Sequence, residues 1–241
     1  MGRRSYSRRY GSHPEQVADL VLPEGPGPFP VVVLVHGGFW RARYGRNLMA
    51  ALADDLAARG RAAWNVEYRR LDAGGGAREA AADVLAAVDA LRDLDAPLAL
   101  DEGVAVVGHS AGGQLALLAA AEGRAARAVG QAAVTDLEEG IRLRLGDGVV
   151  ERFAAGADLA AASPIRRAPL AVPVLLVHGA DDDTVPASMS EAFAARGGDV
   201  TLSVRPGEGH FEHIDPASGA WEGVAAWLGA GRREVVEWPA S

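Results

Sequence analysis

The feature that most constrains this chain is a short apolar run, residues 104–107, that ends directly in Gly-x-Ser-x-Gly at residues 108–112. The segment that follows, residues 114–122, is rich in alanine and leucine. This order predicts a strand, a sharp turn that carries Ser110, and a helix. Glycines on both sides of the turn favour it, because residues without a Cβ let a strand and a helix approach closely. The turn should lift the Ser110 hydroxyl above the edge of a sheet, beside the N–H groups of the helix N-terminus.

Strand and helix patterns alternate along the rest of the chain. The continuous apolar runs at residues 31–35 and 172–177 are typical of strands that are buried on both faces of a parallel sheet. Further strands, with helices between them, are expected at residues 17–22, 61–68, 128–134 and 200–205. This alternation predicts one α/β domain over residues 1–241, with a mostly parallel central sheet and helices on both faces. Ligands of such sheets bind at the carboxyl ends of the strands.

Two segments depart from the alternation. Residues 135–165 are polar and partly helical and have no strand pattern, so we expect them to form a short cap over the site. Three consecutive glycines at residues 74–76 lack both Gly-x-Gly-x-x-Gly and the Lys-Ser/Thr of a phosphate-binding loop. They predict a flexible connection, and we expect no nucleotide cofactor.

Composition excludes several classes of function. The formal net charge is −8 and the arginines are scattered, which argues against a nucleic-acid partner. The chain has no cysteine, so it has no disulfide, thiol nucleophile or thiolate metal site. No apolar run reaches the roughly 18 residues that a membrane span needs, and residues 1–10 are not followed by the apolar region of a signal peptide. We expect a cytoplasmic protein with no membrane partner, and the sequence indicates no particular oligomeric state.

Polar residues follow several of the expected strands. Three adjacent aspartates at residues 181–183 follow the strand at 172–177, and His210 follows the last strand. A serine hydroxyl is a weak nucleophile unless a nearby base takes its proton, and an acceptor must orient that base. The chain offers these groups in the order Ser, Asp, His that α/β-hydrolases use.

Four motifs together make the chain resemble the α/β-hydrolase superfamily, on the branch of small esterases and kynurenine-formamidase-like enzymes. They are His36-Gly-Gly-Phe-Trp40, Gly108-His-Ser110-Ala-Gly-Gly113, His178-Gly-x-x-Asp182-x-x-Val185-Pro186 and Gly209-His210-Phe211. The resemblance extends over residues 17–228 and implies a serine hydrolase without a cofactor. It implies that small carboxylic esters are cleaved through an acyl-enzyme intermediate.

The resemblance also implies a role for each member of a triad. Ser110 would be the nucleophile, and His210 would act as general base and then as general acid. Asp182 would hold the imidazole, because the motif places its acid four residues after His178; the flanking Asp181 and Asp183 are then solvated turn residues. If none of these three is the acid, Asp136 after the preceding strand is the next candidate.

A second set of residues would bind the oxyanion that forms during acyl transfer. By the same resemblance, the donors are the backbone N–H groups of Gly38, Phe39 and Ala111. Phe39 stands where related esterases have a third glycine, which leaves the number of donors open. Trp40 and Arg41 are candidates for the substrate pocket, Arg41 as a partner for a substrate carboxylate. Core packing accounts for Trp40 equally well, and exposed arginines such as Arg41 are usually solvated.

The remaining histidines are expected to be structural. His36 should form a bond within its own loop, and His178 should be buried at a strand end. His213 lies three residues after His210, but no third clustered ligand accompanies the pair, so we expect no metal site.

Three functions fit these observations. The first is hydrolysis of small carboxylic esters. The second is an arylformamidase that cleaves an N-formyl aryl amine such as N-formylkynurenine. The third, from a different class, is a binding protein with the hydrolase fold and no catalysis, which need not keep all three triad residues in their motifs.

Overall fold

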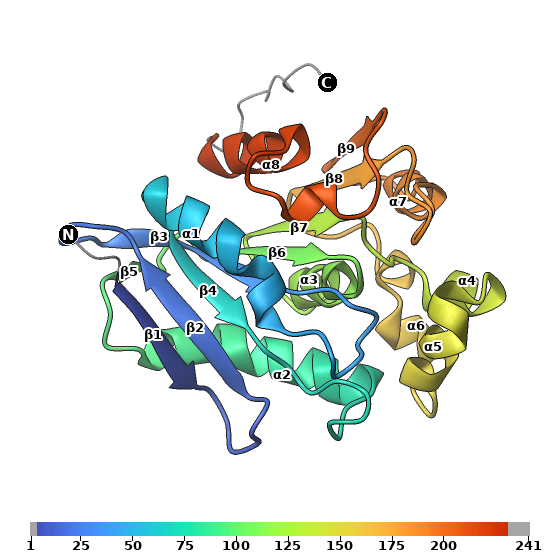
Figure 1. Ribbon diagram of the computed structural model, residues 1–241, viewed down its shortest axis with the longest axis horizontal. Coiled ribbons are helices and arrows are strands. Elements are labelled where there is room, and N and C mark those ends of the chain that lie inside the picture. The colour runs from blue at the N-terminus through green and yellow to red at the C-terminus, as the bar shows by residue number, and fades with distance from the viewer. Residues whose placement is uncertain (1–3, 231–241) are drawn as a thin grey trace.

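A computed structural model describes residues 4–230. Within this range a nine-stranded sheet runs through the molecule in the order β1-β2-β4-β3-β6-β7-β8-β9, and the two-residue β5 pairs with β3 (Figure 1). The strands are β1 (Arg4–Arg9), β2 (Val17–Leu22), β3 (Phe29–Val35), β4 (Ala62–Val66), β5 (Leu98–Ala99), β6 (Ala105–His109), β7 (Arg127–Gln131), β8 (Val174–Gly179) and β9 (Val200–Arg205).

The sheet is parallel from β4 to β9 and antiparallel at one edge, where β2 pairs with β4 and β1 pairs with β2. The edge strand β1 is absent from the sequence-based prediction because its sequence, Arg-Ser-Tyr-Ser-Arg-Arg, shows no apolar alternation. Charged side chains of this kind are common on edge strands, where they discourage pairing with another chain.

Helices cover both faces of the sheet, as the sequence predicts (Figure 1). One face carries α1 and α8, and the other carries α2, α3 and α7. No helix in residues 4–230 has the length and apolar content that crossing a membrane requires. The bounds are α1 (Ala50–Ala58), α2 (Ala77–Asp89), α3 (Ala111–Ala121), α4 (Leu137–Arg142), α5 (Leu145–Ala154), α6 (Leu159–Ala162), α7 (Ser188–Ala194) and α8 (Gly219–Gly229), with 3₁₀ turns at Arg46–Met49, Ala90–Asp93, Pro164–Arg166 and Glu212–Ile214.

Strand β3 shows why a continuous apolar run is needed at the centre. Val31, Val33 and Val35 belong to the core under α2 and α3, whereas Val32 and Leu34 belong to the core under α1 and α8. Alternate side chains of a strand point to opposite faces, so both faces of this strand must be apolar.

The segment between β7 and β8 holds α4, α5 and α6 and, within the described chain, no strand. These short helices lie together beyond the carboxyl ends of β6 and β7 (Figure 1). They lie within residues 135–165, whose role as a cap remains a prediction.

Candidate active site

Ser110 lies on the predicted sharp turn between β6 and α3. Its backbone angles are φ 54° and ψ −117°, a conformation that costs energy for any residue with a Cβ. A Cβ added to Gly108 would lie 2.1 Å from the carbonyl oxygen of Gly112, so the close approach of strand and helix requires glycine. The Ser110 N–H donates to Gln131 O of the neighbouring strand β7 at 2.8 Å, which ties the turn to the sheet.

The Ser110 hydroxyl itself is unpaired. The residue is 1% exposed, and Oγ makes no hydrogen bond to any group in residues 4–230. Gly37 packs directly beside it, because a Cβ added there would lie 3.0 Å from Ser110 Cβ. The described residues therefore show no hydrogen bond between Ser110 and a base; in enzymes without ligand, such bonds are often long or poorly aligned.

His210 and Asp182 form a close pair at the carboxyl edge of the sheet. His210 Nδ1 lies 2.7 Å from Asp182 Oδ2, and the two side chains are 4% and 0% exposed. A carboxylate oxygen only accepts, so the proton lies on Nδ1 and the neutral imidazole keeps a lone pair on Nε2. The pair therefore presents the tautomer that a general base needs.

The Asp182 carboxylate is held on both oxygens. Oδ1 accepts from the N–H groups of Thr184 at 2.9 Å and Val185 at 2.8 Å, and His178 Nε2 lies 3.2 Å from Oδ2. Burial raises the pKa of Asp182, but the hydrogen bonds from His178 and His210, the charge of His210 and the Val185 N–H together hold that pKa well below its usual range. Asp182 is therefore ionised whenever His210 needs an acceptor.

The other acids considered from the sequence do not contact His210 within residues 4–230. Asp181 and Asp183 are exposed, and Asp183 Oδ1 accepts from Thr184 Oγ1 at 3.1 Å. Asp136 accepts from Glu138 N at 2.9 Å and Glu139 N at 3.2 Å, which makes it the N-cap of α4. The structure thus brings Asp182, and neither neighbour, to His210.

His178 is fully buried at the end of β8, as the sequence predicts. Its Nε2 donates to Val185 O at 2.9 Å, and its Nδ1 bonds Ser190 Oγ at 2.7 Å. Its contact with Asp182 was not expected from the sequence, although a spacing of four residues in the motif allows the two side chains to meet.

Two further histidines pack against His210. His109 Nε2 donates to His210 O at 2.9 Å, and the two rings are 4.7 Å apart. His213 is fully buried and its Nε2 accepts from Gly179 N at 3.1 Å. Burial, together with the nearby His178 and His210, lowers the pKa of His213 to about 3, so this ring is neutral at physiological pH. Within residues 4–230 no group of three His, Asp or Glu side chains could hold a metal ion.

The loop after β3 lies beside Ser110. Gly38, Phe39 and Trp40 all have positive φ, at 103°, 50° and 53°. The N–H groups of Gly38, Phe39 and Ala111, which are the predicted oxyanion donors, bond to no other group of the described residues. Unpaired donors beside a serine are what an oxyanion hole requires.

The two predicted pocket residues link this loop to the segment between β7 and β8. Trp40 is fully buried and stacks on Phe153 of α5, with ring centres 4.0 Å apart and planes 7° apart. Arg41 Nη2 donates to Gly146 O of α5 at 2.5 Å. Trp40 therefore lies in the core behind the loop, and Arg41 donates a hydrogen bond to α5.

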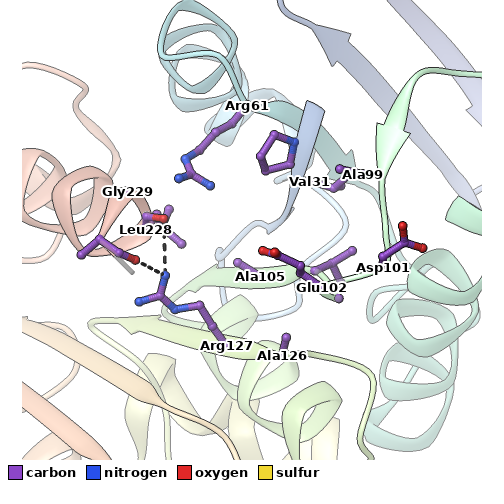
Figure 2. Close-up of a pocket in the computed structure, with 14 residues that line it drawn as sticks. Val31, Arg61, Ala99, Asp101, Glu102, Ala105, Ala126, Arg127, Leu228 and Gly229 are labelled. Carbon is purple, nitrogen blue, oxygen red and sulfur yellow. Dashed lines mark hydrogen bonds between the residues drawn. The ribbon is translucent and has the colours of Figure 1, made fainter. Parts of the chain in front are cut away.

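A cavity of about 930 Å³ lies at the other end of the sheet, among the amino ends of β3, β6 and β7 and the end of α8 (Figure 2). Arg61 and Arg127 both reach toward Leu228 and Gly229 there (Figure 2). None of the predicted site residues lines this cavity, so its size does not make it the catalytic site.

Comparisons with solved structures show the same fold. Esterase B from Lactobacillus rhamnosis superposes with a TM-score of 0.79 at 22% identity, over 94% of this chain and 84% of that one. A truncated carbohydrate esterase from gut microbiota gives 0.80 at 18% identity, over 94% and 95%. A thermophilic esterase of Thermogutta terrifontis gives 0.74 at 23% identity, over 93% and 90%. No curated protein matches the sequence significantly.

Family models give a more specific result. A model described as BD-FAE matches residues 18–148, and one described as serine hydrolase matches residues 87–230, more than half of the chain in each case. The second match includes Ser110, Asp182 and His210. With the sheet order and helical layers described above, the chain belongs to the serine hydrolase family and has the α/β-hydrolase fold.

Proposed function

We propose that this serine hydrolase cleaves small carboxylic esters through an acyl-enzyme formed on Ser110. The observation that carries the proposal is the 2.7 Å pair between His210 Nδ1 and a buried, multiply bonded Asp182, at the same sheet edge as a serine on a strained turn. Carboxylic esters fit this machinery because their acyl carbon accepts an oxygen nucleophile and their leaving alcohol needs one proton.

In the acylation step, Ser110 Oγ attacks the acyl carbon while His210 Nε2 takes the hydroxyl proton. Asp182 keeps the other proton on Nδ1 and stabilises the imidazolium that forms. The tetrahedral oxyanion accepts hydrogen bonds from the unused N–H groups of Ala111 and Gly38, with Phe39 as a third donor. When the intermediate collapses, His210 gives its proton to the leaving alcohol.

Deacylation repeats these steps with water. His210 Nε2 takes a proton from the water as its oxygen attacks the acyl carbon, and the second tetrahedral intermediate uses the same donors. His210 then returns the proton to Ser110 Oγ as the carboxylic acid leaves. No cofactor takes part in these steps.

The segment at residues 135–165 belongs to this proposal as a cap. Phe39 packs against it, because a Cβ added to Gly146 would lie 3.1 Å from the Phe39 ring. With the Trp40 stack on α5 and the Arg41 bond, the loop that supplies oxyanion donors and the cap are one packed unit. We therefore place the acyl pocket between this unit and Ser110. The proposed substrate is a small molecule, and the proposed location of the protein is the cytoplasm.

The test combines a covalent label with a substrate series. Fluorophosphonate labelling, followed by peptide mass spectrometry, should modify Ser110, and p-nitrophenyl esters of increasing chain length should show a preference for short acyl groups. Solved structures of Thermogutta terrifontis esterase 2 phosphonylated by sarin make this class of reagent a suitable probe. Labelling of another serine, or no labelling together with no ester hydrolysis, would overturn the proposal in favour of a non-catalytic binding protein.

The arylformamidase alternative is tested in the same assay. An N-formyl aryl amine has a nitrogen leaving group, so the same triad would protonate an amine rather than an alkoxide. A higher kcat/KM for N-formylkynurenine than for any p-nitrophenyl ester would replace the ester hydrolase with an arylformamidase.

A further inference from the structure

His36, the first residue after β3, is fully buried and uses both ring nitrogens. Its Nδ1 lies 2.7 Å from Gly37 O, and its Nε2 lies 2.7 Å from Glu67 Oε1. The ring also stacks on Tyr68 with centres 4.5 Å apart. A bond within its own loop was expected from the sequence, but the contact with Glu67, directly after β4 (Ala62–Val66), was not.

The Glu67 carboxylate also bonds two backbone groups. Its Oε1 accepts from Tyr68 N at 3.2 Å, and its Oε2 accepts from Arg46 N at 3.0 Å. These bonds hold the carboxylate in place against the His36 ring. A carbonyl oxygen only accepts, so the bond between His36 Nδ1 and Gly37 O requires a proton on Nδ1.

The bond to Gly37 O fixes the direction of one peptide plane. In a trans peptide the C=O and the following N–H point in opposite directions, and the cis peptides of residues 4–230 are all X-Pro bonds elsewhere. Because Gly37 O points at the His36 ring, the Gly38 N–H points away from it. Gly37 packs against Ser110, so this N–H belongs to the peptide that lies beside the nucleophile.

We propose that His36 and Glu67 are positioning residues for the oxyanion hole: the ring of His36, held by Glu67, donates to Gly37 O and thereby aims the Gly38 N–H at the reacting oxygen. The inference rests on the ester hydrolase proposed above. Neither side chain touches the substrate, so each acts through the orientation of this one peptide.

Surrounding contacts hold the pair in place. The parallel register of β3 and β4 sets Val35 beside Val66, and so brings the next residues, His36 and Glu67, together. Arg70 bonds the carbonyl oxygens of Ala42 and Tyr44 in the same loop, and its Nε lies 3.3 Å from Glu67 Oε1. Glu15 pairs with Arg70 at the edge of this network. The loop is thus fixed at both ends before a substrate arrives.

Two substitutions of His36 separate the positioning role from simple packing. An asparagine amide nitrogen falls near the place of Nδ1, whereas a glutamine amide nitrogen falls near the place of Nε2. His36→Asn should keep a donor to Gly37 O and lose less than about tenfold in kcat. His36→Gln should keep the contact with Glu67, lose the donor to Gly37 and lower kcat by about 10²-fold, the usual cost of one oxyanion donor.

Glu67→Gln removes the charge and should lower kcat by about tenfold, whereas Glu15→Gln, a matched control in the same network without contact to His36, should leave kcat unchanged. KM should stay within about threefold, because the oxyanion exists only in the transition state. The pH at which kcat/KM falls to half on the acid side should stay at the wild-type value in every variant, because Asp182 and His210 are untouched.

Failure of the positioning role and failure of the proposed ester hydrolysis give different results in these experiments. A wild-type protein without ester hydrolysis or labelling overturns that function. Wild-type hydrolysis with equal kcat in His36→Asn, His36→Gln and Glu67→Gln overturns the positioning role alone, as does a shifted acid limb or a loss expressed in KM. Circular dichroism checks folding, and if His36→Gln does not fold, the comparison of Glu67→Gln with Glu15→Gln decides.

Discussion

The two halves of the candidate site differ in how completely their polar groups are paired. On the acid-base half, His210 bonds Asp182, and Asp182 receives two backbone N–H groups and His178. On the nucleophile half, Ser110 Oγ and the N–H groups of Gly38, Phe39 and Ala111 have no partner within residues 4–230. The polar groups of the acid-base half are hydrogen-bonded in the folded protein. In the proposed mechanism, a substrate supplies the partners of the nucleophile half.

This difference follows from what each half must do. In the mechanism proposed above, the acid-base half keeps one proton on His210 Nδ1 through every step, so its bonds can be permanent. The nucleophile half must offer donors to a charge that exists only in the transition state, so those donors have to be unused beforehand. The positive φ values of Ser110, Phe39 and Trp40 all lie on this half, where the surrounding fold holds the backbone strain in place.

The largest effect is expected from a substitution that removes the reactive oxygen of the nucleophile half. Ser110→Ala should lower kcat by about 10⁴-fold or more without loss of fold, because the substitution removes a single unpaired oxygen. His210→Ala should be about as damaging, and the double variant hardly worse, because the two residues act as one unit. The measurement is kcat on one activated ester with active-site titration. If the fold-loss of kcat in the double variant equals the product of the two single fold-losses, the two halves act independently.

The second largest effect is expected in the acid-base half. Asp182→Asn should lower kcat by about 10³- to 10⁴-fold, because the amide no longer fixes the His210 tautomer. Asp181→Asn and Asp183→Asn, matched controls on the same turn, should each change kcat less than about tenfold because their side chains are exposed. All three are compared at a pH where His210 is neutral, with circular dichroism as the folding check. The largest loss at Asp183 would mean that the acid had been assigned one residue too early.

The smallest effect concerns stability. It involves His213, which lies near the acid-base half. His213 has its pKa lowered by burial to about 3, so the folded protein keeps this ring neutral while the unfolded chain gains a proton below about pH 6.5. The free energy of unfolding should therefore fall as pH drops from 6.5 toward 3, by about 2 kcal/mol at pH 4.5 from His213 alone. The lowered pKa of Asp182 acts in the same direction, because its stabilising charge is lost at still lower pH.

Urea unfolding at several pH values checks this effect. His213→Gln keeps an acceptor for Gly179 N and should flatten the dependence between pH 6.5 and 4.5. His13→Gln changes a histidine on the far side of the molecule and should retain the wild-type slope. An unchanged slope in His213→Gln would remove His213 from the account and leave the acid sensitivity to other groups.

Much of this arrangement could be read from the sequence because its signals are local. Glycines at both ends of the elbow, an apolar run for each buried strand and polar motifs at the strand ends are set by residues adjacent in the chain. The antiparallel edge strand β1 escaped because an exposed strand needs no apolar pattern, and β5 escaped because two residues carry no periodicity.

The sequence by itself determined the α/β fold class, the turn that carries Ser110 and the residue types of a serine hydrolase. The tertiary structure alone decided other pairings: His36 with Glu67 across 31 positions and His109 with the His210 carbonyl across 101. It also brought the expected pair of His210 and Asp182 together across 28 positions. Hydrophobic periodicity specifies that a strand is buried, but not which strand lies beside it. The order and register of the strands, fixed by packing of the whole sheet, bring these groups within hydrogen-bonding distance.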